Sequence, residues 1–152
     1  MENRERDQIA RVWQRVQGGS GDGESGLELQ YLIEALWEDA RLYRQISRRR
    51  KGRKAAIAMQ LHRQAAAHLK ILKGVCALQD RCHPVFSTAA PGKEPEIVSL
   101  RRCYGHAAQR LGWYTTREQD PQCGHIFAQL AREEQASSRL LLQLMQGASQ
   151  KN

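Results

Sequence analysis

No stretch of the sequence approaches the roughly 18 consecutive apolar residues that a membrane-spanning helix requires. The opening MENRERDQ is polar and lacks the apolar segment of a secretory signal peptide. We therefore expect a cytoplasmic protein that does not enter a membrane. Aromatic residues make up only 6% of the 152 residues, yet hydrophobic residues reach 41%, which excludes a disordered chain and suits one domain with a sizeable core.

The sequence also lacks the CxxC spacing of zinc and redox motifs. Its cysteines are separated by five, twenty and nineteen residues, and we expect free thiols at Cys76, Cys82, Cys103 and Cys123. A weaker alternative is a zinc site built from Cys82–His83 and Cys123–His125, which requires two distant segments to converge. No set of nucleophile, base and orienting group is visible.

Acidic residues are fewer than basic ones, and the formal charge is +8 at pH 7. The densest basic run is a candidate anion-binding site, with nucleic acid as the corresponding partner, and it comprises Arg48, Arg49, Arg50, Lys51, Arg53 and Lys54. The run falls between two predicted helices, where arginines are favoured near the negative end of the preceding helix. We favour a solvated turn, because no aromatic residue interleaves the run to stack on bases.

Apolar residues recur at helical spacing in five segments. Residues 1–24 are expected to form a short amphipathic helix, with Ile9, Val12, Trp13 and Val16 on its stripe, followed by a glycine-rich linker. The four longer stripes predict a helical bundle over residues 25–147, and residues 148–152 are expected to fray.

The first two bundle helices are predicted over residues 25–48 and 54–78, the first opened by a capping box at Ser25. The third stripe runs through Leu100, Cys103, Tyr104, Ala107, Leu111 and Tyr114. The fourth helix is expected to begin at Asp120–Pro121 and to end at Gly147. The stripes carry only two acidic or basic side chains, His68 and Glu134, and the rest of the bundle centre is expected to be apolar or small.

Residues 80–97 hold three prolines in a polar setting and are too long for a tight hairpin. We expect them to cross over along the bundle. Two helix pairs joined by one long crossover are the connectivity of ferritin-like four-helix bundles, so the predicted fold class is all-α, with the short N-terminal helix as an addition.

Three stretches carry a more specific resemblance: residues 100–105, 120–124 and 130–134. Over roughly residues 25–146 the chain resembles a divergent, bacterial-type member of the rubrerythrin-like branch of the ferritin-like proteins. The resemblance implies two metal ions, usually iron, at the bundle centre, where oxygen or peroxide reacts. Their ligands in the family are a glutamate from each of two helices and a Glu-x-x-His from each of the other two.

Most of these ligands are replaced in this chain. The two single glutamates correspond to Leu36 and Ala107. The two Glu-x-x-His motifs correspond to Ala65 with His68, and to Glu134 with Ser137. Since two divalent ions need several anionic donors, the retained His68 and Glu134 are too few for a dimetal oxidase.

A buried glutamate is costly without a partner, so we expect Glu134 to lie within hydrogen-bond reach of His68 or of a tyrosine hydroxyl. A weaker alternative keeps His68 and Glu134 as two ligands of a single iron or zinc ion, completed by water or by Cys103.

The function expected from these residues is non-catalytic: a scaffold, a self-associating protein or a binding partner of another protein, without a cofactor. The small-residue faces permit a homodimer. The alternatives are a rubrerythrin-like non-haem iron oxidoreductase with a residual site at His68 and Glu134, and polyanion binding through the basic run.

Overall fold

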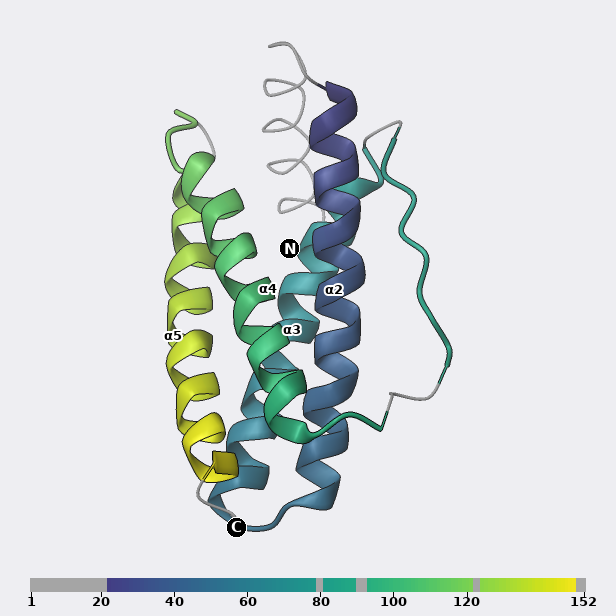
Figure 1. The fold of residues 1–152 in the computed structure, drawn as a ribbon. Coiled ribbons are helices and arrows are strands. Elements are labelled where there is room, and N and C mark those ends of the chain that lie inside the picture. The colour runs from purple at the N-terminus through teal and green to yellow at the C-terminus, as the bar shows by residue number, and fades with distance from the viewer. Residues whose placement is uncertain (1–21, 79–80, 90–92, 122–123, 150–152) are drawn as a thin grey trace.

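The chain folds into a bundle of four helices (Figure 1). The computed structural model describes residues 22–78, 81–89, 93–121 and 124–149, and this part contains four helices and no strand. The helices are α2 (Asp22–Arg49), α3 (Arg53–Cys76), α4 (Glu96–Thr116) and α5 (Gly124–Ser149). The predicted all-α four-helix bundle is therefore confirmed, while the helix predicted over residues 3–17 lies outside the described residues.

The helix boundaries differ from the predicted ones by a few residues. Helix α2 begins at Asp22, within the expected linker and before the predicted capping box. Helix α5 is described from Gly124, and residues 122–123 just before it lie outside the described residues. The carbonyl of Asp120 accepts a hydrogen bond from Gly124 N, which is the bond expected of a residue that caps a helix start, so the start at Asp120–Pro121 stays a prediction. Gly147 does not end α5, which continues to Ser149. Local propensity marks these ends only approximately, because packing decides how far each helix extends.

Glycine is required at two of the connections. Gly52, between α2 and α3, has a φ of 68°, a left-handed conformation that side chains with a Cβ rarely adopt. Gly124, at the start of α5, lies so close to the carbonyl group of Glu118 that a Cβ would collide with it. These two positions allow the chain to reverse tightly after α2 and before α5.

The four helices form two antiparallel pairs. Helix α2 packs chiefly on α3, and α4 packs chiefly on α5, with α3–α5 and α2–α4 contacts joining the pairs. Because the connection between the pairs returns along the bundle, α3 and α4 run in the same direction (Figure 1). The interior is filled by large apolar side chains from all four helices, among them Leu29, Ile33, Leu36, Ile46, Leu61, Leu72, Leu100, Phe127, Leu141 and Leu144.

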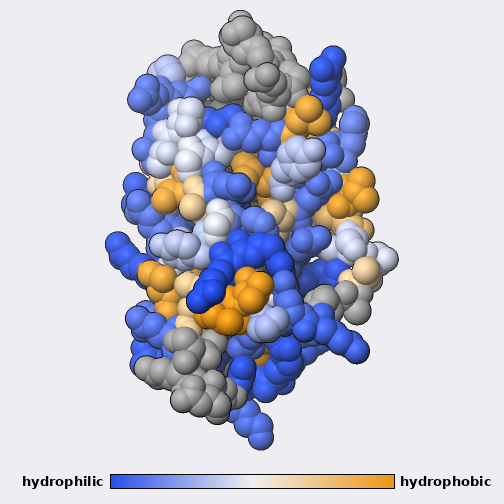
Figure 2. All heavy atoms as spheres, viewed as in Figure 1, coloured by the Kyte–Doolittle hydropathy of each residue, from blue (hydrophilic) through white to orange (hydrophobic). Residues whose placement is uncertain are grey.

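The predicted stripes match this core with one clear exception. Tyr104, expected on the buried stripe of α4, is 38% exposed, and Arg110 is buried on that helix instead. On the face shown in Figure 2, hydrophilic side chains surround small, separate hydrophobic patches. None of the helices in the described part is both long and apolar enough to cross a membrane.

The connection between the pairs lies along α2 in an extended conformation (Figure 1). We call residues 81–89 the crossover strap. Its backbone N–H groups at His83 and Val85 donate to Gln30 Oε1 (3.0 Å) and Glu34 Oε2 (2.7 Å). Its carbonyls at Ser87 and Ala89 accept from the Arg41 guanidinium at 2.7 and 3.1 Å.

The spacing of these contacts follows from helix and strand geometry. Four helical residues rise about 6 Å, and two extended residues span about 6.6 Å. Side chains one turn apart on α2 can therefore reach every second residue of the strap. Ring contacts add to this attachment. The centroid of the Phe86 ring lies 5.3 Å from that of Trp37, and Lys73 Nζ of α3 lies over the Phe86 ring, 4.7 Å from its centroid.

A disulfide joins the end of α3 to the beginning of the crossover strap. Cys76 and Cys82 are bonded, with their Cα atoms 5.4 Å apart, so the expectation of free thiols is wrong for both. Two residues six apart in sequence come this close because the chain turns back directly after α3. Disulfides persist mainly in oxidising compartments, so this bond does not support the expected cytoplasmic location.

The strap's attachment predicts a measurable effect of Arg41. Replacing Arg41 with alanine removes two hydrogen bonds to the strap and the stacking of the guanidinium on Trp37, at 4.6 Å from the ring centroid. The expected loss is about 1–2 kcal/mol in the free energy of unfolding, measured by urea titration. The control is Arg44→Ala, an exposed arginine on the same helix, which should change stability by less than about 0.5 kcal/mol. Equal effects of the two substitutions would contradict the role given to Arg41.

Candidate functional site

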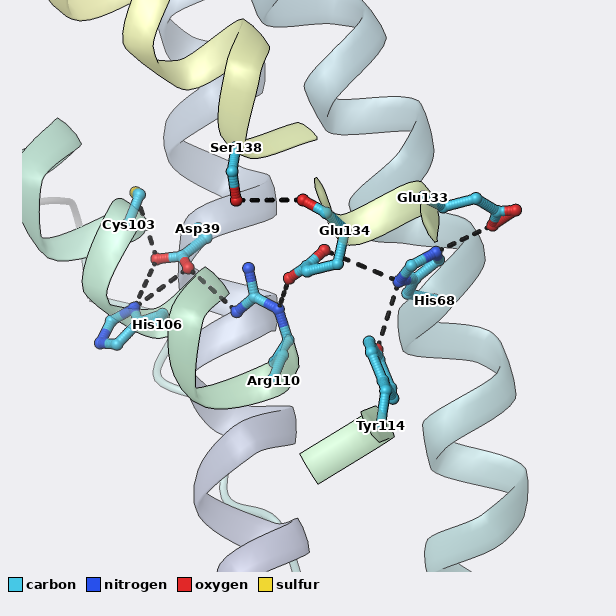
Figure 3. Close-up of polar contacts among 9 residues, drawn as sticks. All are labelled: Asp39, His68, Cys103, His106, Arg110, Tyr114, Glu133, Glu134 and Ser138. Carbon is cyan, nitrogen blue, oxygen red and sulfur yellow. Dashed lines mark hydrogen bonds and ion pairs between the residues drawn. The ribbon is translucent and has the colours of Figure 1, made fainter. Parts of the chain in front are cut away.

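Polar side chains form a continuous row through the middle of the bundle (Figure 3). We call it the polar row, and every helix contributes to it: Asp39 from α2, His68 from α3, His106 and Arg110 from α4, and Glu133 and Glu134 from α5. Its inner members Asp39, His68, Arg110 and Glu134 are 1–3% exposed, whereas the side chains of His106 and Glu133 at its ends are 21% and 37% exposed.

Arg110 is the centre of the row. Its guanidinium donates through Nε to Glu134 Oε1 and through Nη1 to Asp39 Oδ2 at 3.4 Å, and so joins α5 to α2. Burial disfavours its charge, but the carboxylates of Glu134 and Asp39 outweigh that effect and raise the pKa of Arg110 above its usual value. The guanidinium therefore stays charged, and each buried carboxylate has a cationic partner.

Asp39 connects the arginine to one side of the bundle. Its carboxylate contacts His106 Nδ1 at 3.0 Å and accepts the Cys103 thiol hydrogen at 3.3 Å. The contact with a carboxylate requires His106 Nδ1 to carry a hydrogen. Burial and the charge of Asp39 raise the pKa of the Cys103 thiol, and burial with the neighbouring Cys103 raises the pKa of Tyr43.

His68 forms the other side of the row. Its Nε2 lies 3.0 Å from Glu133 Oε1 and its Nδ1 lies 3.2 Å from the Tyr114 hydroxyl. In the neutral ring these contacts assign the hydrogen to Nε2, which donates to Glu133, while Nδ1 accepts from Tyr114. Burial and the nearby Glu134 raise the pKa of Tyr114, so its hydroxyl keeps the hydrogen that it donates.

The prediction that Glu134 forms its hydrogen bond with His68 or a tyrosine hydroxyl is wrong. His68 Nδ1 lies 3.9 Å from Glu134 Oε2, which is an ion-pair distance rather than a hydrogen bond, and the hydrogen bond goes to Arg110. The expectation that the rest of the bundle centre is apolar or small is wrong, because Asp39 and Arg110 are buried there. The spacing could have shown this: Asp39 follows Leu36 by three residues, and Arg110 follows Ala107 by three.

The six positions that the family resemblance assigns to metal ligands are all buried. Leu36, Ala65, Ala107 and Ser137 are 0–7% exposed, as are His68 and Glu134. Among the described residues, no group of three or more His, Cys, Asp or Glu side chains is arranged to hold a metal ion. In addition, the Arg110 guanidinium already occupies one oxygen of each of the two inner carboxylates, Glu134 and Asp39. These residues do not fit a dimetal centre.

The basic run lies where the sequence predicted, around the turn between α2 and α3. Arg50 and Arg49 contact the Glu96 carboxylate at the start of α4, at 2.8 and 3.4 Å, and Arg53 donates to Gln143 Oε1 at 3.4 Å. Arg48 and Lys51 are exposed, and Lys54 is partly exposed. Part of the run thus fastens the turn to α4 and α5.

The alternative zinc site does not assemble from the described residues. Cys82 is bonded to Cys76 and cannot act as a thiolate ligand. His83 and His125 are exposed, and Cys123 lies outside the described residues. Cys103, the free cysteine of the described part, is buried on the polar row instead.

The chain matches no protein-family model, no curated protein and no solved structure. Raised pKa values keep Cys103, Tyr43 and Tyr114 protonated at neutral pH, so none of them is an activated nucleophile. The row is suited to holding four helices together through satisfied buried charges.

We expect a large loss of stability when the central cation is removed. Arg110→Met leaves the carboxylates of Asp39 and Glu134 buried without the guanidinium, and the free energy of unfolding should fall by about 3–5 kcal/mol in urea titrations. If that variant is too unstable to titrate, a triple variant that also replaces Asp39 and Glu134 with leucine should recover most of the loss.

The control for this experiment is Arg102→Met on the same helix. Arg102 pairs with Glu94, but its side chain is 50% exposed, so the loss should stay below about 1 kcal/mol. If the triple variant were no more stable than Arg110→Met, the loss would not come from unpaired carboxylates.

The raised thiol pKa predicts alkaline sensitivity. In the unfolded chain Cys103 ionises above about pH 8.5, whereas the folded chain retains the proton, so stability falls as pH rises. The loss should be about 1.4 kcal/mol per pH unit between pH 9 and 10. Cys103→Ser keeps a hydroxyl donor for Asp39 but has no thiol to ionise, so its free energy of unfolding should not show this loss. Urea titrations at pH 7, 9 and 10 measure the difference. Parallel pH profiles of the two proteins would contradict a buried, protonated thiol.

Proposed function

We propose that this protein is a non-catalytic four-helix bundle, of ferritin-like and rubrerythrin-like type, in which an internal arginine replaces the metal ions as the central cation. It acts by binding, as a scaffold or through association with itself or another protein. The observation that carries the proposal is the Arg110 guanidinium between the carboxylates of Asp39 and Glu134. A positive charge already satisfies these carboxylates, so they are poor ligands for a further cation.

The buried ligand positions support the same proposal. In a metal-binding bundle, inward-facing carboxylates are needed at several of them, because the ions' charge must be offset. Here Leu36, Ala65 and Ala107 fill that space with apolar atoms. Apolar packing and one internal ion network thus stand where the family has metal ligands.

A residual site at His68 and Glu134 remains the main alternative. Its support is the 3.9 Å approach of His68 Nδ1 to Glu134 Oε2. Against it, Glu134 Oε1 holds Arg110, and His68 Nδ1 lies within hydrogen-bond distance of Tyr114. A metal ion there would have to displace both contacts with only two protein ligands.

Elemental analysis separates these possibilities. The purified chain, incubated anaerobically with ferrous iron or with zinc and then desalted, should retain well below one metal ion per chain. Glu134→Gln and His68→Ala are the matched controls: adventitious metal stays unchanged in both, whereas a site at these residues loses its metal in both. Retention of two iron ions per wild-type chain, lost in Glu134→Gln, or peroxide turnover with the same dependence, would overturn the proposal.

A further inference from the structure

A groove lies between the first turns of α2 and the last turns of α4, which are at the same end of the bundle (Figure 1). Its volume is about 640 Å³, and its walls include Tyr31 and Leu32 of α2 and Trp113 of α4. This volume suits a small molecule as well as the apolar face of a short helix, so the residues that line the groove have to decide between them.

The floor of the groove is formed by small residues. Ala108 and Gly112 of α4 are exposed one turn apart, and a Cβ built on Gly112 would meet no atom within 4 Å. The α2 side carries exposed apolar surface, with Tyr31 67% and the neighbouring Leu27 46% exposed. Small floor residues allow a helix axis to approach closely, and the apolar rim supplies the surface to bury.

One end of the groove is shielded from water. The Arg117 guanidinium lies 3.6 Å from the centroid of the Trp113 ring, and burial lowers the pKa of Arg117 to about 10 although the charge of Glu28 acts in the opposite direction. Glu28 of α2 and Arg117, directly after α4, are on opposite walls, so the groove offers both signs of charge beside its apolar floor.

The chain itself supplies a segment of matching character directly before α2. Ile9, Val12, Trp13 and Val16 form one apolar stripe in a sequence that predicts a helix over residues 3–17, and residues 18–21 are mostly glycine. This segment is too short to be a stable helix without a surface to pack on.

The linker is long enough to bring the segment back to the groove. A helix of residues 3–17 would be about 22 Å long, and the four linker residues can span up to about 14 Å. The floor and walls on α4, from Ala108 to Arg117, extend about 14 Å along that helix, and Leu32 lies about 15 Å along α2 from its start. The linker therefore permits the segment to turn back and lie along the groove.

We propose that residues 3–17 dock in this groove of their own chain, with the stripe of Ile9, Val12, Trp13 and Val16 against Tyr31, Leu32, Ala108 and Gly112. A short flexible linker gives the segment an effective concentration in the millimolar range, so it outcompetes a second copy of the chain. The groove is then an intramolecular binding site for this segment.

The test blocks the floor of the groove in the full-length chain. In the wild type, amides of residues 3–17 should exchange hydrogen at least ~10-fold more slowly than in an unstructured peptide, measured by mass spectrometry. Gly112→Glu places a carboxylate under the apolar stripe and should abolish this protection. The bundle itself should stay folded, because there is open space at Gly112 and glutamate is a better helix former than glycine.

Gly105→Glu is the matched control. Gly105 lies two turns earlier on α4, also has open space at its Cβ and does not line the groove, so protection of residues 3–17 should be retained. Trp13→Ala should reduce protection from the other side of the contact.

Three results would overturn the proposal. The first is exchange of residues 3–17 at unstructured rates in the wild type, and the second is an equal loss of protection in both glycine variants. The third is protection found only in a dimer by light scattering and lost on dilution to monomer, which would assign the groove to a second copy.

Discussion

The bundle depends on one buried cation shared between two buried anions. Arg110 reaches Asp39 on α2 and Glu134 on α5 from α4, and His68 of α3 lies beside Glu134. The three charged side chains, Asp39, Arg110 and Glu134, would each be strongly destabilising alone, since an uncompensated charge in a protein interior costs several kcal/mol. They are tolerated only together, and only when all four helices are in the observed register.

The need to pair these buried charges fixes how the helices are placed relative to one another. Apolar packing alone accepts many arrangements of similar volume, so helices with Leu- and Ala-rich faces can slide or rotate at modest cost. A displacement of one turn would move Arg110 about 5.4 Å from its carboxylates and leave them unpaired. We therefore regard the row as a device for specifying one arrangement, with the surrounding apolar core supplying the free energy of folding. The partly exposed ends, His106 and Glu133, allow the charges to be balanced by solvent at both sides.

Much of the architecture followed from the sequence. Apolar periodicity identified the four bundle helices, and the proline-containing connection indicated the crossover. The centre was predicted less well, because the apolar stripes were traced without Asp39 and Arg110. These two residues belong to different helix pairs, so their pairing requires the packing of α2 on α4. The disulfide was missed for a related reason: the separation of Cys76 and Cys82 matches no motif, and their proximity depends on how the chain leaves α3.

The crossover strap has a further consequence for how this fold can vary. Side chains of α2 hold the strap mainly by the strap's own main-chain N–H and C=O groups, which every amino acid except proline supplies in full. Val85, for example, is 76% exposed, and its side chain contributes little to the attachment. The attachment therefore depends on the extended shape and the length of the strap more than on the identity of its outward residues. An epitope or a reactive handle can therefore replace outward strap residues without disturbing the bundle centre, as long as Gln30, Glu34 and Arg41 of α2 are kept.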